Sequence, residues 1–382
     1  MKILFINYHH LNSNSGIHIF NLANHLSRLG MDCTVCVPSQ KETVTALGKP
    51  EFETLNFSDL LDEKQRPAKR FDLIHAWTPR EVVRKTAVEL RKIYACPLVV
   101  HLEDNEDYLI KVLLRLPVAV LRRFPSLLLN TVTPNFMSHP LRYPEFLRSA
   151  DGGTVIMDGL REFFPATTPT ELIWAGYQED MEWSLPKDMD LRRQLKINED
   201  EFVVVYTGNV HRGNFTEVSN LYAAITDLRS RGYKVRLVRT GSDHLRFPTP
   251  EWRAVKKDSI EMGHLPRSKM PSVLSIADAL VQPGEPGLFN DYRFPSKLPE
   301  YLASGKPVIL PNANIGRYLK NNEECLLLEK GDARDIAQKI ERLTLDEELR
   351  KRIGAGGRLF AEQNLKWGKI AEKLHSFYQT FA

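Results

Sequence analysis

The sequence is poor in cysteine, carries little net charge and contains no long apolar run, and each shortage excludes a class of protein. Four cysteines among 382 residues do not make a disulfide framework, so we expect a reducing, cytoplasmic setting. The 52 basic and 48 acidic residues give a net charge of +4, which excludes a dedicated nucleic-acid binder. No stretch of about 18 apolar residues exists and the N-terminus is too short for a signal peptide, so no transmembrane helix is expected.

What the sequence does contain is ordinary globular composition and a regular alternation of strand and helix patterns. Hydrophobic residues make up 42% of the chain, and its length suggests two domains. One series of buried-strand and amphipathic-helix patterns opens at residues 2–7, and a second opens at 202–206. We place domains at 1–178 and 179–365, followed by a C-terminal helix at 366–382 that packs back towards the first domain. Two such series predict an α/β protein of two doubly wound Rossmann-like domains facing a cleft.

Two groups of potential metal ligands have simpler explanations. Cys33 and Cys36 form a C-x-x-C pair, but the residues around them predict a strand, on which positions three apart face opposite sides. The four acids between 103 and 107 follow His101 and could bind a metal or orient a substrate. We favour the solvated first turn of a helix, where the helix dipole stabilises acidic side chains. The sequence therefore predicts no metal site.

The most informative stretch, residues 290–309, reads as a loop, a helix start and a strand. Ser296 is a suitable N-cap for that helix, and Gly305 ends it. A helix N-terminus offers free N–H groups and a positive dipole end to an anion such as a diphosphate, and Lys297 adds a charge there. Glu300 lies about one turn in, where a carboxylate can accept hydrogen bonds from a ribose diol. A surface helix in which Glu300 merely offsets the dipole explains the pattern equally well.

This stretch resembles the C-terminal donor-site motif of retaining GT-B glycosyltransferases, specifically glycosyltransferase family 4. The resemblance spans most of the chain and implies the GT-B fold, with the acceptor bound by residues 1–178 and a nucleotide-sugar donor by 179–365. The block at 295–309 is highly specific in combination, and the other matching segments are weak singly. Those segments are 15–16, 72–76, 99–101, 206–208, 263–266 and 277–278.

The resemblance assigns roles to individual residues of the motif. Glu300 matches the second of the family's two glutamates, which binds the nucleotide ribose. The first would fall on Tyr292 and is therefore absent. Asn290 or Asp291 is expected to take over contacts to the sugar.

The diphosphate contacts are also altered relative to the family. Arg212 occupies the usual lysine position, whereas Asn209 stands where arginine is common, and Lys297 can restore the missing charge. The planar fork of an arginine suits a diphosphate, and a solvated loop arginine is the alternative. The predicted donor-binding residues are Gly16, Gly208, Arg212, Leu265, Asn290, Asp291, Tyr292, Ser296, Lys297, Leu298 and Glu300.

In the N-terminal domain, two positions follow predicted parallel strands. Gly16 lies at the first strand-to-helix turn, where the lack of a Cβ lets backbone N–H groups approach a phosphate. His101 ends a strand, and the resemblance implies that it contacts the donor sugar near the reacting centre. A structural histidine is the alternative, and His75 is a weaker candidate. With Arg212 and Lys297, His101 completes the predicted catalytic set.

Residues 108–130 combine many leucines and valines with four basic residues and no acid. Such a segment, carrying Lys111, Arg115, Arg122 and Arg123, can lie in an anionic membrane interface. A core-packed pair of helices with basic edges is the alternative, and the sequence does not decide between them. Association with the inner face of the membrane is therefore included among our expectations.

Taken together, the residues and the resemblance predict a retaining glycosyltransferase, most simply a hexosyltransferase. It would move a sugar from a UDP- or GDP-sugar to a hydroxyl of a glycan or lipid-linked acceptor, in polysaccharide or glycolipid biosynthesis. The resemblance implies retention by a front-face route in which the leaving phosphate helps to deprotonate the acceptor, without a metal or other cofactor. A sugar-nucleotide epimerase of the same fold, or a catalytically silent sugar-nucleotide-binding protein, are the alternatives.

Overall fold

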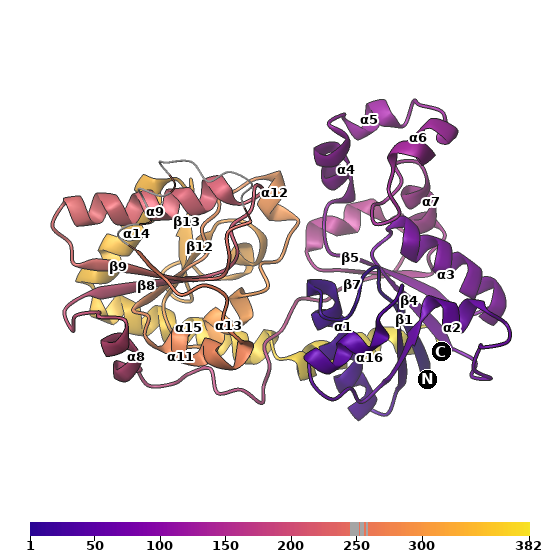
Figure 1. Ribbon diagram of the computed structural model, residues 1–382, viewed down its shortest axis with the longest axis horizontal. Helices are drawn as coiled ribbons and strands as arrows, with labels where there is room; N and C mark the ends of the chain where they lie inside the picture. Colours follow the sequence, from indigo (N-terminus) through magenta and orange to yellow (C-terminus); the bar gives the residue numbers. More distant parts are fainter. Residues whose placement is uncertain (245–251, 253–255, 257–258) are drawn as a thin grey trace. The chain divides into compact units, whose positions relative to one another are not determined.

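The computed structural model describes residues 1–244, 252, 256 and 259–382, which fold into two compact α/β units (Figure 1). The N-terminal unit consists of Met1–Ala175, Tyr292–Phe294 and the C-terminal segment Trp367–Ala382. The C-terminal unit consists of Gly176–Asp291 and Pro295–Lys366. Each unit contains one parallel sheet with helices around it, so the predicted pair of doubly wound domains is confirmed.

The N-terminal unit is built on a seven-stranded sheet in the order β3-β2-β1-β4-β5-β6-β7, and all its neighbouring strands run parallel. Every residue of β4 and β5 is buried, because helices cover both faces of the sheet. The order reverses direction between β1 and β4, and ligands of such sheets bind at the carboxyl ends of the strands beside this point. The strands are β1 (Lys2–Ile6), β2 (Asp32–Val37), β3 (Glu53–Asn56), β4 (Leu73–Trp77), β5 (Leu98–Leu102), β6 (Gly152–Val155) and β7 (Thr170–Leu172).

Helices α1 and α16 lie side by side against this sheet although they come from opposite ends of the chain (Figure 1). α1 begins after Ser13, whose hydroxyl accepts a hydrogen bond from the N–H of Gly16 (3.2 Å) and so caps the helix. The helices are α1 (Asn14–Arg28), α2 (Phe57–Leu61), α3 (Glu81–Tyr94), α4 (Glu106–Leu114), α5 (Val118–Leu121), α6 (Ser126–Val132), α7 (Arg142–Arg148) and α16 (Trp367–Gln379), with 3-10 turns η1 (Lys41–Ala46) and η2 (Asp158–Phe163).

The C-terminal unit repeats the plan with a six-stranded parallel sheet in the order β10-β9-β8-β11-β12-β13. Its direction reverses between β8 and β11. The strands are β8 (Phe202–Thr207), β9 (Val235–Thr240), β10 (Ser259–Glu261), β11 (Ala279–Val281), β12 (Val308–Pro311) and β13 (Leu326–Leu328). The helices are α8 (Met189–Gln194), α9 (Phe215–Ser230), α11 (Met270–Ser275), α12 (Leu288–Asp291), α13 (Leu298–Ala303), α14 (Ala333–Leu345) and α15 (Glu347–Asn364), with 3-10 turns η4 (Arg267–Lys269) and η5 (Asn314–Tyr318).

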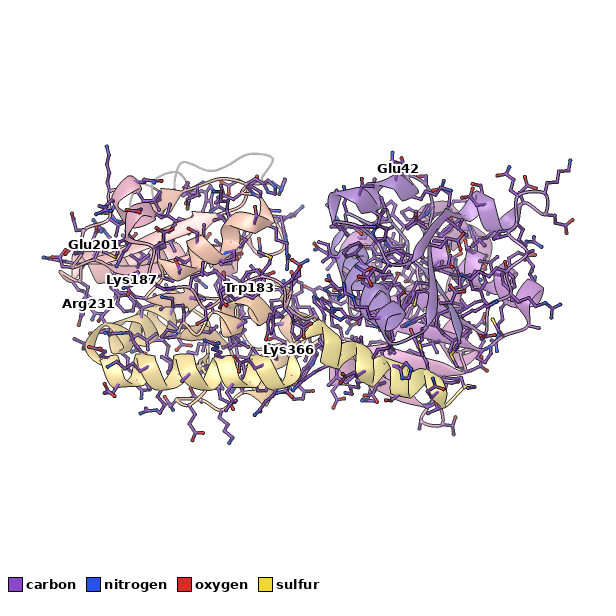
Figure 2. The ribbon with its side chains drawn as sticks, turned by 90° about the horizontal axis from the view of Figure 1, so that it is seen from below. Glu42, Trp183, Lys187, Glu201, Arg231 and Lys366 are labelled. Carbon is purple, nitrogen blue, oxygen red and sulfur yellow. The ribbon has the colours of Figure 1, made fainter. Side chains whose placement is uncertain are left out.

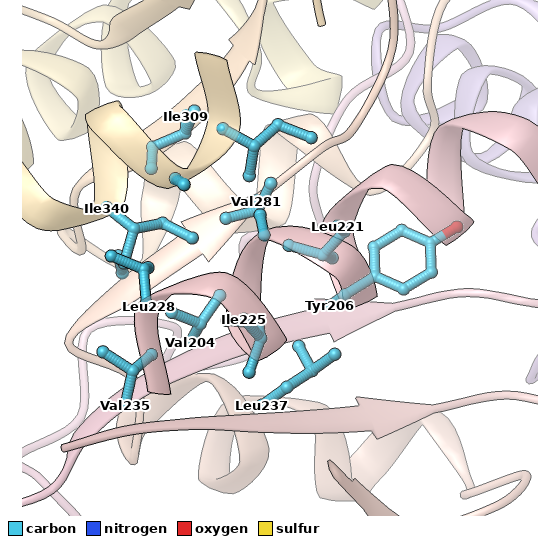
Figure 3. Packing of buried hydrophobic residues seen from close by; sticks show 14 of the residues in the cluster. Val204, Tyr206, Leu221, Ile225, Leu228, Val235, Leu237, Val281, Ile309 and Ile340 are labelled. Carbon is cyan, nitrogen blue, oxygen red and sulfur yellow. The ribbon is translucent and has the colours of Figure 1, made fainter. Parts of the chain in front are cut away.

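The core of the C-terminal unit lies between the sheet and helices α9 and α14 (Figure 3). Leu221 and Ile225 of α9 pack against Val204 and Leu237 of the sheet, and Ile340 of α14 closes the layer. Burial of such side chains contributes roughly 1.5–3 kcal/mol each, which fixes the carboxyl ends of β8, β9 and β11 as a firm platform.

Two strands lie outside the predicted alternation. β3 contains a single apolar residue, Leu55, and pairs with only one neighbour at the edge of its sheet, so it lacks the pattern of a buried strand. β13 has only three residues, all leucines, which is too short to show any periodicity. The prediction for Cys33 and Cys36 is confirmed: both lie in β2 as free, buried thiols, and burial raises the pKa of Cys33 to about 12.

Candidate functional site

Two glycines meet at the carboxyl ends of β8 and β9 in the C-terminal unit. The N–H of Gly208 donates to the carbonyl of Thr240 (3.0 Å), directly before Gly241. Gly241 has a φ of +103°, and a Cβ there would lie 2.4 Å from the carbonyl oxygen of Gly208. Both the backbone angle and this close approach require glycine. The two loops therefore present bare backbone at the edge of the sheet where ligands of this fold bind.

Lys297 reaches the same glycine from the start of α13. A Cβ on Gly208 would lie 2.7 Å from the Lys297 Nζ and 2.9 Å from the hydroxyl oxygen of Tyr206. The ammonium also lies 4.3 Å from the centre of the Tyr206 ring, within range of a cation–π interaction. The structure thus brings together Gly208 and Lys297, a pairing of bare backbone with a cation that suits an anionic ligand.

The second predicted cation, Arg212, lies apart from this pair. It is exposed in the loop between β8 and α9, and no contact within the described part of the chain fixes its guanidinium. In the same loop, the Asn209 side chain accepts a hydrogen bond from the N–H of Ser242 (2.8 Å) and so joins the loops after β8 and β9. Asn209 is therefore a structural residue at the position where the family commonly has arginine.

Glu300 lies buried on α13 and forms an ion pair with Arg267. Burial raises the pKa of the Glu300 carboxyl, while Arg267 and Lys297 oppose that shift. Arg267 also donates from Nε to the side-chain oxygen of Gln178 (2.8 Å). Arg267 was not predicted from the sequence, although it stands two residues after Leu265 in a segment that matches the family. The carboxylate, two cations and the glycine loops form the candidate ligand site of this unit.

The predicted helix start at Ser296 is wrong. α13 begins at Leu298 and is only six residues long, and the capping position falls on Lys297, without any side-chain capping bond. Ser296 is exposed, whereas Leu298 is fully buried and its N–H donates to the carbonyl of Pro295 (3.0 Å). A helix this short has a weak dipole, so the positive charge of this site comes mainly from Lys297 and Arg267.

The two residues expected to contact the sugar have structural contacts of their own. Asn290 is buried, and its amide donates to the Glu217 carboxylate (2.6 Å) and to the carbonyl of Glu285 (2.8 Å). Asp291 forms an ion pair with Arg317 (2.7 Å). Contacts of this kind hold α12 in place and do not by themselves point to a ligand.

Tyr292 belongs to the N-terminal unit rather than to the candidate ligand site. Its hydroxyl donates to the Glu162 carboxylate (2.5 Å), and its ring meets Phe163 edge-on at 6.3 Å. At the position of the family's first glutamate, this chain therefore has an aromatic residue that packs on η2.

In the N-terminal unit, the space beside Gly16 is filled by the chain itself. A Cβ there would lie 2.1 Å from the carbonyl oxygen of Leu11. The Gly16 N–H is already used by Ser13. Glycine is thus needed to close the turn between β1 and α1, and the predicted approach of a phosphate to its N–H has no support in the geometry.

His101 lies in β5, fully buried, with its ring stacked on Trp77 (3.9 Å between ring centres, 25°). Its Nδ1 lies 2.8 Å from the hydroxyl of Thr154, while Nε2 has no partner in the described part of the protein. Burial lowers the pKa of His101 to about 3, even though the nearby Glu103 opposes that shift. The ring is therefore neutral at physiological pH, with one nitrogen unused.

The acids after β5 are predicted only in part: Glu106 and Asp107 do lie in the first turn of α4, but Glu103 precedes the helix and Glu106 is buried rather than solvated. Burial alone would raise the pKa of Glu103, but hydrogen bonding and the nearby charge of His18 hold it at about 2. The carboxylate also accepts hydrogen bonds from Ser15 and from the Trp77 indole N–H (2.7 Å). Glu103 is thus a fully engaged anchor between α1 and the strands β4 and β5.

Glu106 is also buried, but its pKa is shifted in the direction opposite to that of Glu103. One carboxyl oxygen accepts from the Ser138 hydroxyl (2.8 Å), and the other has no partner among the described residues. Burial raises the pKa of Glu106 to about 7, against the opposing charge of Arg80. Nearby, Thr78 follows β4 with a φ of +75°, an unusual angle for a β-branched residue of the kind that clusters at functional sites. No group of three or more His, Cys, Asp or Glu side chains in the described ranges is arranged to hold a metal ion.

A second charged region of the C-terminal unit does not qualify as a ligand site. An open cavity at the amino end of β8 is lined by Lys187, Glu201 and Asp278 among others. Figure 2 labels Lys187 and Glu201 among the side chains of this unit. Its charges pair with one another: Asp278 with Lys187 (2.5 Å) and with Arg192 (3.3 Å). It also lies at the end of β8 that is remote from Gly208, where sheets of this type do not bind ligands.

Comparison with known proteins assigns a family to part of the chain. Residues 188–360, nearly all in the C-terminal unit, match the family described as Glycosyl transferases group 1. The capsular polysaccharide biosynthesis glycosyltransferase CapM of Staphylococcus aureus is 30% identical to this chain over 195 residues. That alignment covers 49% of this chain and 48% of CapM, so the chain matches about half the length of this curated relative. Residues 188–360 are therefore similar to the group 1 glycosyl transferases.

Solved structures share the fold over the whole chain. HepE of Anabaena in complex with UDP has a TM-score of 0.74 at 16% identity and covers 100% of both chains, and HepE with UDP-glucose has a TM-score of 0.71 at 15% identity, again over 100% of both. A putative UDP-N-acetylglucosamine 2-epimerase from Listeria monocytogenes has a TM-score of 0.58 at 12% identity, covering 99% of this chain and 96% of that one. Such identities establish the fold alone, which is the two-domain GT-B type.

Proposed function

We propose that this protein is a retaining glycosyltransferase that moves a sugar from a UDP-sugar to a hydroxyl of a growing polysaccharide. The observation that carries the proposal is the cluster of Lys297 over Gly208, with Glu300 and Arg267 beside it, inside the segment that matches the group 1 family. UDP is favoured over GDP because the structural neighbour HepE binds UDP and UDP-glucose. A polysaccharide acceptor is favoured because CapM acts in capsular polysaccharide biosynthesis.

In this proposal the C-terminal unit binds the nucleotide. Glu300 accepts hydrogen bonds from the two ribose hydroxyls, and Arg267 keeps its buried carboxylate ionised. Lys297 and the backbone around Gly208 bind the diphosphate, and Arg212 moves in from the solvent to share that contact. A fixed cation opposite the departing diphosphate stabilises the negative charge that develops as the glycosidic C–O bond breaks.

The transfer step itself uses the leaving diphosphate as the base. The bond between the anomeric carbon and the diphosphate oxygen breaks, and the acceptor oxygen bonds to that carbon on the same face. The acceptor's proton passes to the departing diphosphate oxygen, so no protein carboxylate is needed as nucleophile. His101 contributes a hydrogen bond from its unused Nε2 to an oxygen of the sugar. Loss of this contact would slow the step without changing nucleotide affinity.

The ribose contact gives the sharpest test of the site. A hydrogen bond to a charged carboxylate contributes roughly 1.5–3 kcal/mol, or about ten- to a hundredfold in affinity. Glu300→Ala should therefore weaken UDP by that factor and have much less effect on 2′,3′-dideoxy-UDP, which has no diol. Glu347→Ala, at an exposed carboxylate of α15, is the matched control. An unchanged ratio between the two ligands in Glu300→Ala would refute the ribose assignment.

Incubation with the donor alone separates this proposal from its alternatives. An epimerase would convert a UDP-sugar without any acceptor, whereas a silent binding protein would turn over nothing. A glycosyltransferase should release UDP rapidly only when a suitable acceptor is present. The protein should therefore show acceptor-dependent UDP release.

We further propose that residues 111–136 dock on an anionic membrane where lipid-linked acceptors are found. No helix within the described ranges has the length and apolar character needed to cross a bilayer. Nine of the sixteen large hydrophobic side chains found exposed in the described structure nevertheless fall between Val112 and Phe136. Leu127 is 79% exposed, and the flanking Lys111, Arg115 and Arg123 are exposed as well. A surface that mixes apolar and basic side chains in this way fits the interface of an anionic bilayer.

Liposome sedimentation tests this surface. The wild type should sediment with anionic vesicles and not with neutral ones, and the triple variant Lys111→Gln, Arg115→Gln, Arg123→Gln should stay in solution. A control that neutralises Lys64, Arg70 and Lys92, which are exposed elsewhere in the same unit, should bind like the wild type. If the two triple variants lose binding equally, only net charge matters and the docking surface is wrong.

A further inference from the structure

A continuous chain of hydrogen bonds runs through the interior of the N-terminal unit and ends at His101. The Tyr378 hydroxyl lies 2.5 Å from Nδ1 of His75, and Nε2 of His75 lies 2.9 Å from the Thr154 hydroxyl. The same hydroxyl lies 2.8 Å from Nδ1 of His101. All four side chains are fully buried and come from different elements, namely α16, β4, β6 and β5.

The number of protons in this chain restricts how it can be arranged. Each neutral imidazole carries one N–H, and each hydroxyl carries one O–H, so four protons serve three hydrogen bonds. The fourth proton must therefore point away from the chain, either from His101 Nε2 at one end or from a hydroxyl. A buried donor without a partner costs roughly 1–3 kcal/mol, so the arrangement with the fewest such groups is favoured.

Of the possible directions, one leaves a single group unsatisfied. If Tyr378 donates to His75, His75 to Thr154 and Thr154 to His101, then only the Nε2–H of His101 lacks a partner. In the reverse direction, the Tyr378 O–H would have no acceptor among the described residues, and the bare Nε2 of His101 would still be unused. If both histidines donate to the Thr154 oxygen, the Thr154 O–H has no acceptor within the chain of hydrogen bonds. The first direction is therefore the stable one.

We propose that Tyr378, His75 and Thr154 are positioning residues that hold His101 in the Nε2–H tautomer, poised to donate to an uncharged oxygen of the sugar substrate. This proposal rests on the proposed function for the identity of the ligand, but the tautomer itself is a property of the ligand-free protein. Burial lowers the pKa of both rings, and the charged groups that face His101 are Glu103 and His18. His101 therefore stays a neutral donor across the whole physiological range, where an ordinary histidine would titrate.

The chain also gives the C-terminal helix a part in the site. Tyr378 lies on α16, more than 270 residues after His101 in the sequence, and the helix packs so closely that a Cβ on Gly152 would lie 2.4 Å from the Phe381 ring. Within α16 itself, Phe377 would lie 3.2 Å from that Cβ, and Tyr378 places the first donor of the chain against His75 of β4. A change confined to α16 should consequently alter the hydrogen bonding of His101 on β5.

A pair of substitutions at Thr154 separates this role from simple packing. Thr154→Val keeps the shape and removes the hydroxyl, whereas Thr154→Ser keeps the hydroxyl and removes the methyl group. If the hydroxyl orders His101, the valine variant should lose about tenfold or more in kcat, a typical effect of a lost hydrogen bond near the reacting atoms, and the serine variant should stay within about twofold of wild type. A packing role predicts the reverse order, and that result would overturn the proposal.

Nitrogen NMR of histidine-labelled protein reads the tautomer directly. We expect both His75 and His101 to carry the proton on Nε2 and to show no titration between about pH 5.5 and 8.5. The His101 signal should shift towards a mixture of tautomers in Thr154→Val and, to a lesser extent, in Tyr378→Phe. Tyr143→Phe, which removes a hydroxyl from an equally buried tyrosine of the same unit, should leave the signal unchanged.

Kinetics and histidine NMR give different results when the His101 tautomer is wrong and when the glycosyltransferase activity is wrong. A wild-type His101 with its proton on Nδ1 overturns the inference whatever the protein's activity. An Nε2–H tautomer that depends on Thr154 supports it even if no sugar nucleotide is turned over. In that second case the missing turnover counts against the glycosyltransferase proposal alone.

Discussion

Each unit carries a glycine where its first strand leads into the next helix, but different atoms lie opposite the two glycines. A Cβ on Gly16 would strike the backbone of Leu11, whereas a Cβ on Gly208 would meet the mobile ammonium of Lys297. In the N-terminal unit the chain fills its own turn, and in the C-terminal unit the backbone is left open beside a cation. Gly16, in the first turn of α1, thus closes the chain on itself, whereas Gly208, directly after β8, leaves backbone beside a cation.

The two units also differ in whether their polar side chains suit an uncharged or a charged ligand. His75 and His101 of the N-terminal unit are neutral, and Glu103 is saturated with hydrogen bonds, so these polar groups suit uncharged hydroxyls. The C-terminal unit instead collects Lys297, Arg267 and a buried carboxylate at a glycine loop, which suits a charged nucleotide. It is this second unit that matches the group 1 glycosyl transferase family.

Substitution of the two glycines should give the largest difference between the two units. Gly16→Ala forces a methyl group into the Leu11 backbone and should lower the free energy of unfolding by about 3 kcal/mol. Gly208→Ala should lower stability less than Gly16→Ala, because its Cβ would meet the ends of the Lys297 and Tyr206 side chains rather than backbone, but it should weaken UDP. Urea unfolding followed by tryptophan fluorescence measures the first effect and calorimetric titration the second. Equal losses of stability in both variants would show that the two turns do not differ.

The next largest effect is expected on turnover. His101→Ala removes a pre-oriented donor and should lower kcat about a hundredfold, as the loss of a comparable donor does in other enzymes. The KM for the UDP-sugar should stay nearly unchanged, because the nucleotide is held in the other unit. His375→Ala, a half-buried histidine on α16, serves as the control. A folded His101→Ala variant with full turnover would remove this residue from the site.

Glu106, a buried acid of the N-terminal unit, should make the stability of the protein depend on pH. Because burial raises its pKa to about 7 in the folded protein, the folded state binds more protons than the unfolded state above the ordinary glutamate pKa. Stability from this group is therefore present below that value and is lost as the pH rises towards 7. Glu106→Gln should be more stable than wild type by on the order of 2 kcal/mol at about pH 8, and by little at about pH 4. Thermal unfolding at the two pH values checks this, and a pH-independent difference would contradict the assignment.

The smallest effect concerns Arg267. Without this partner, burial should raise the pKa of Glu300 further, so that part of the ribose carboxylate is protonated in mild acid. Arg267→Ala should weaken UDP about three- to tenfold at pH 6 and by less than about twofold at pH 8.5, since a neutral carboxyl is the poorer acceptor. Arg267→Lys should restore most of the pH 6 affinity. A constant loss at both pH values would mean that Arg267 acts on the phosphates instead.

The sequence predicted the two parallel sheets because long buried strands and amphipathic helices alternate in a regular way. Lys297, Gly208 and Glu300 could be placed in one site because a recognisable motif carries them. Arg267 was missed because its role depends on an ion pair with Glu300, 33 residues away, which no local pattern records. The burial of Glu106 and the hydrogen bonding of Glu103 were missed because a run of acids looks solvated until the elements packed around it are known. The chain from Tyr378 to His101 joins four separate elements and could be found only in three dimensions.

If the C-terminal unit alone binds the nucleotide, the UDP affinities of three variants should divide by unit. Titration calorimetry should show Lys297→Ala and Glu300→Ala each weakened by about ten- to a hundredfold, because each loses a charge-assisted contact. His101→Ala should bind UDP within about twofold of wild type, because its hydrogen bond goes to the sugar. The opposite result, with His101→Ala weakened and the two C-terminal variants unaffected, would contradict the account.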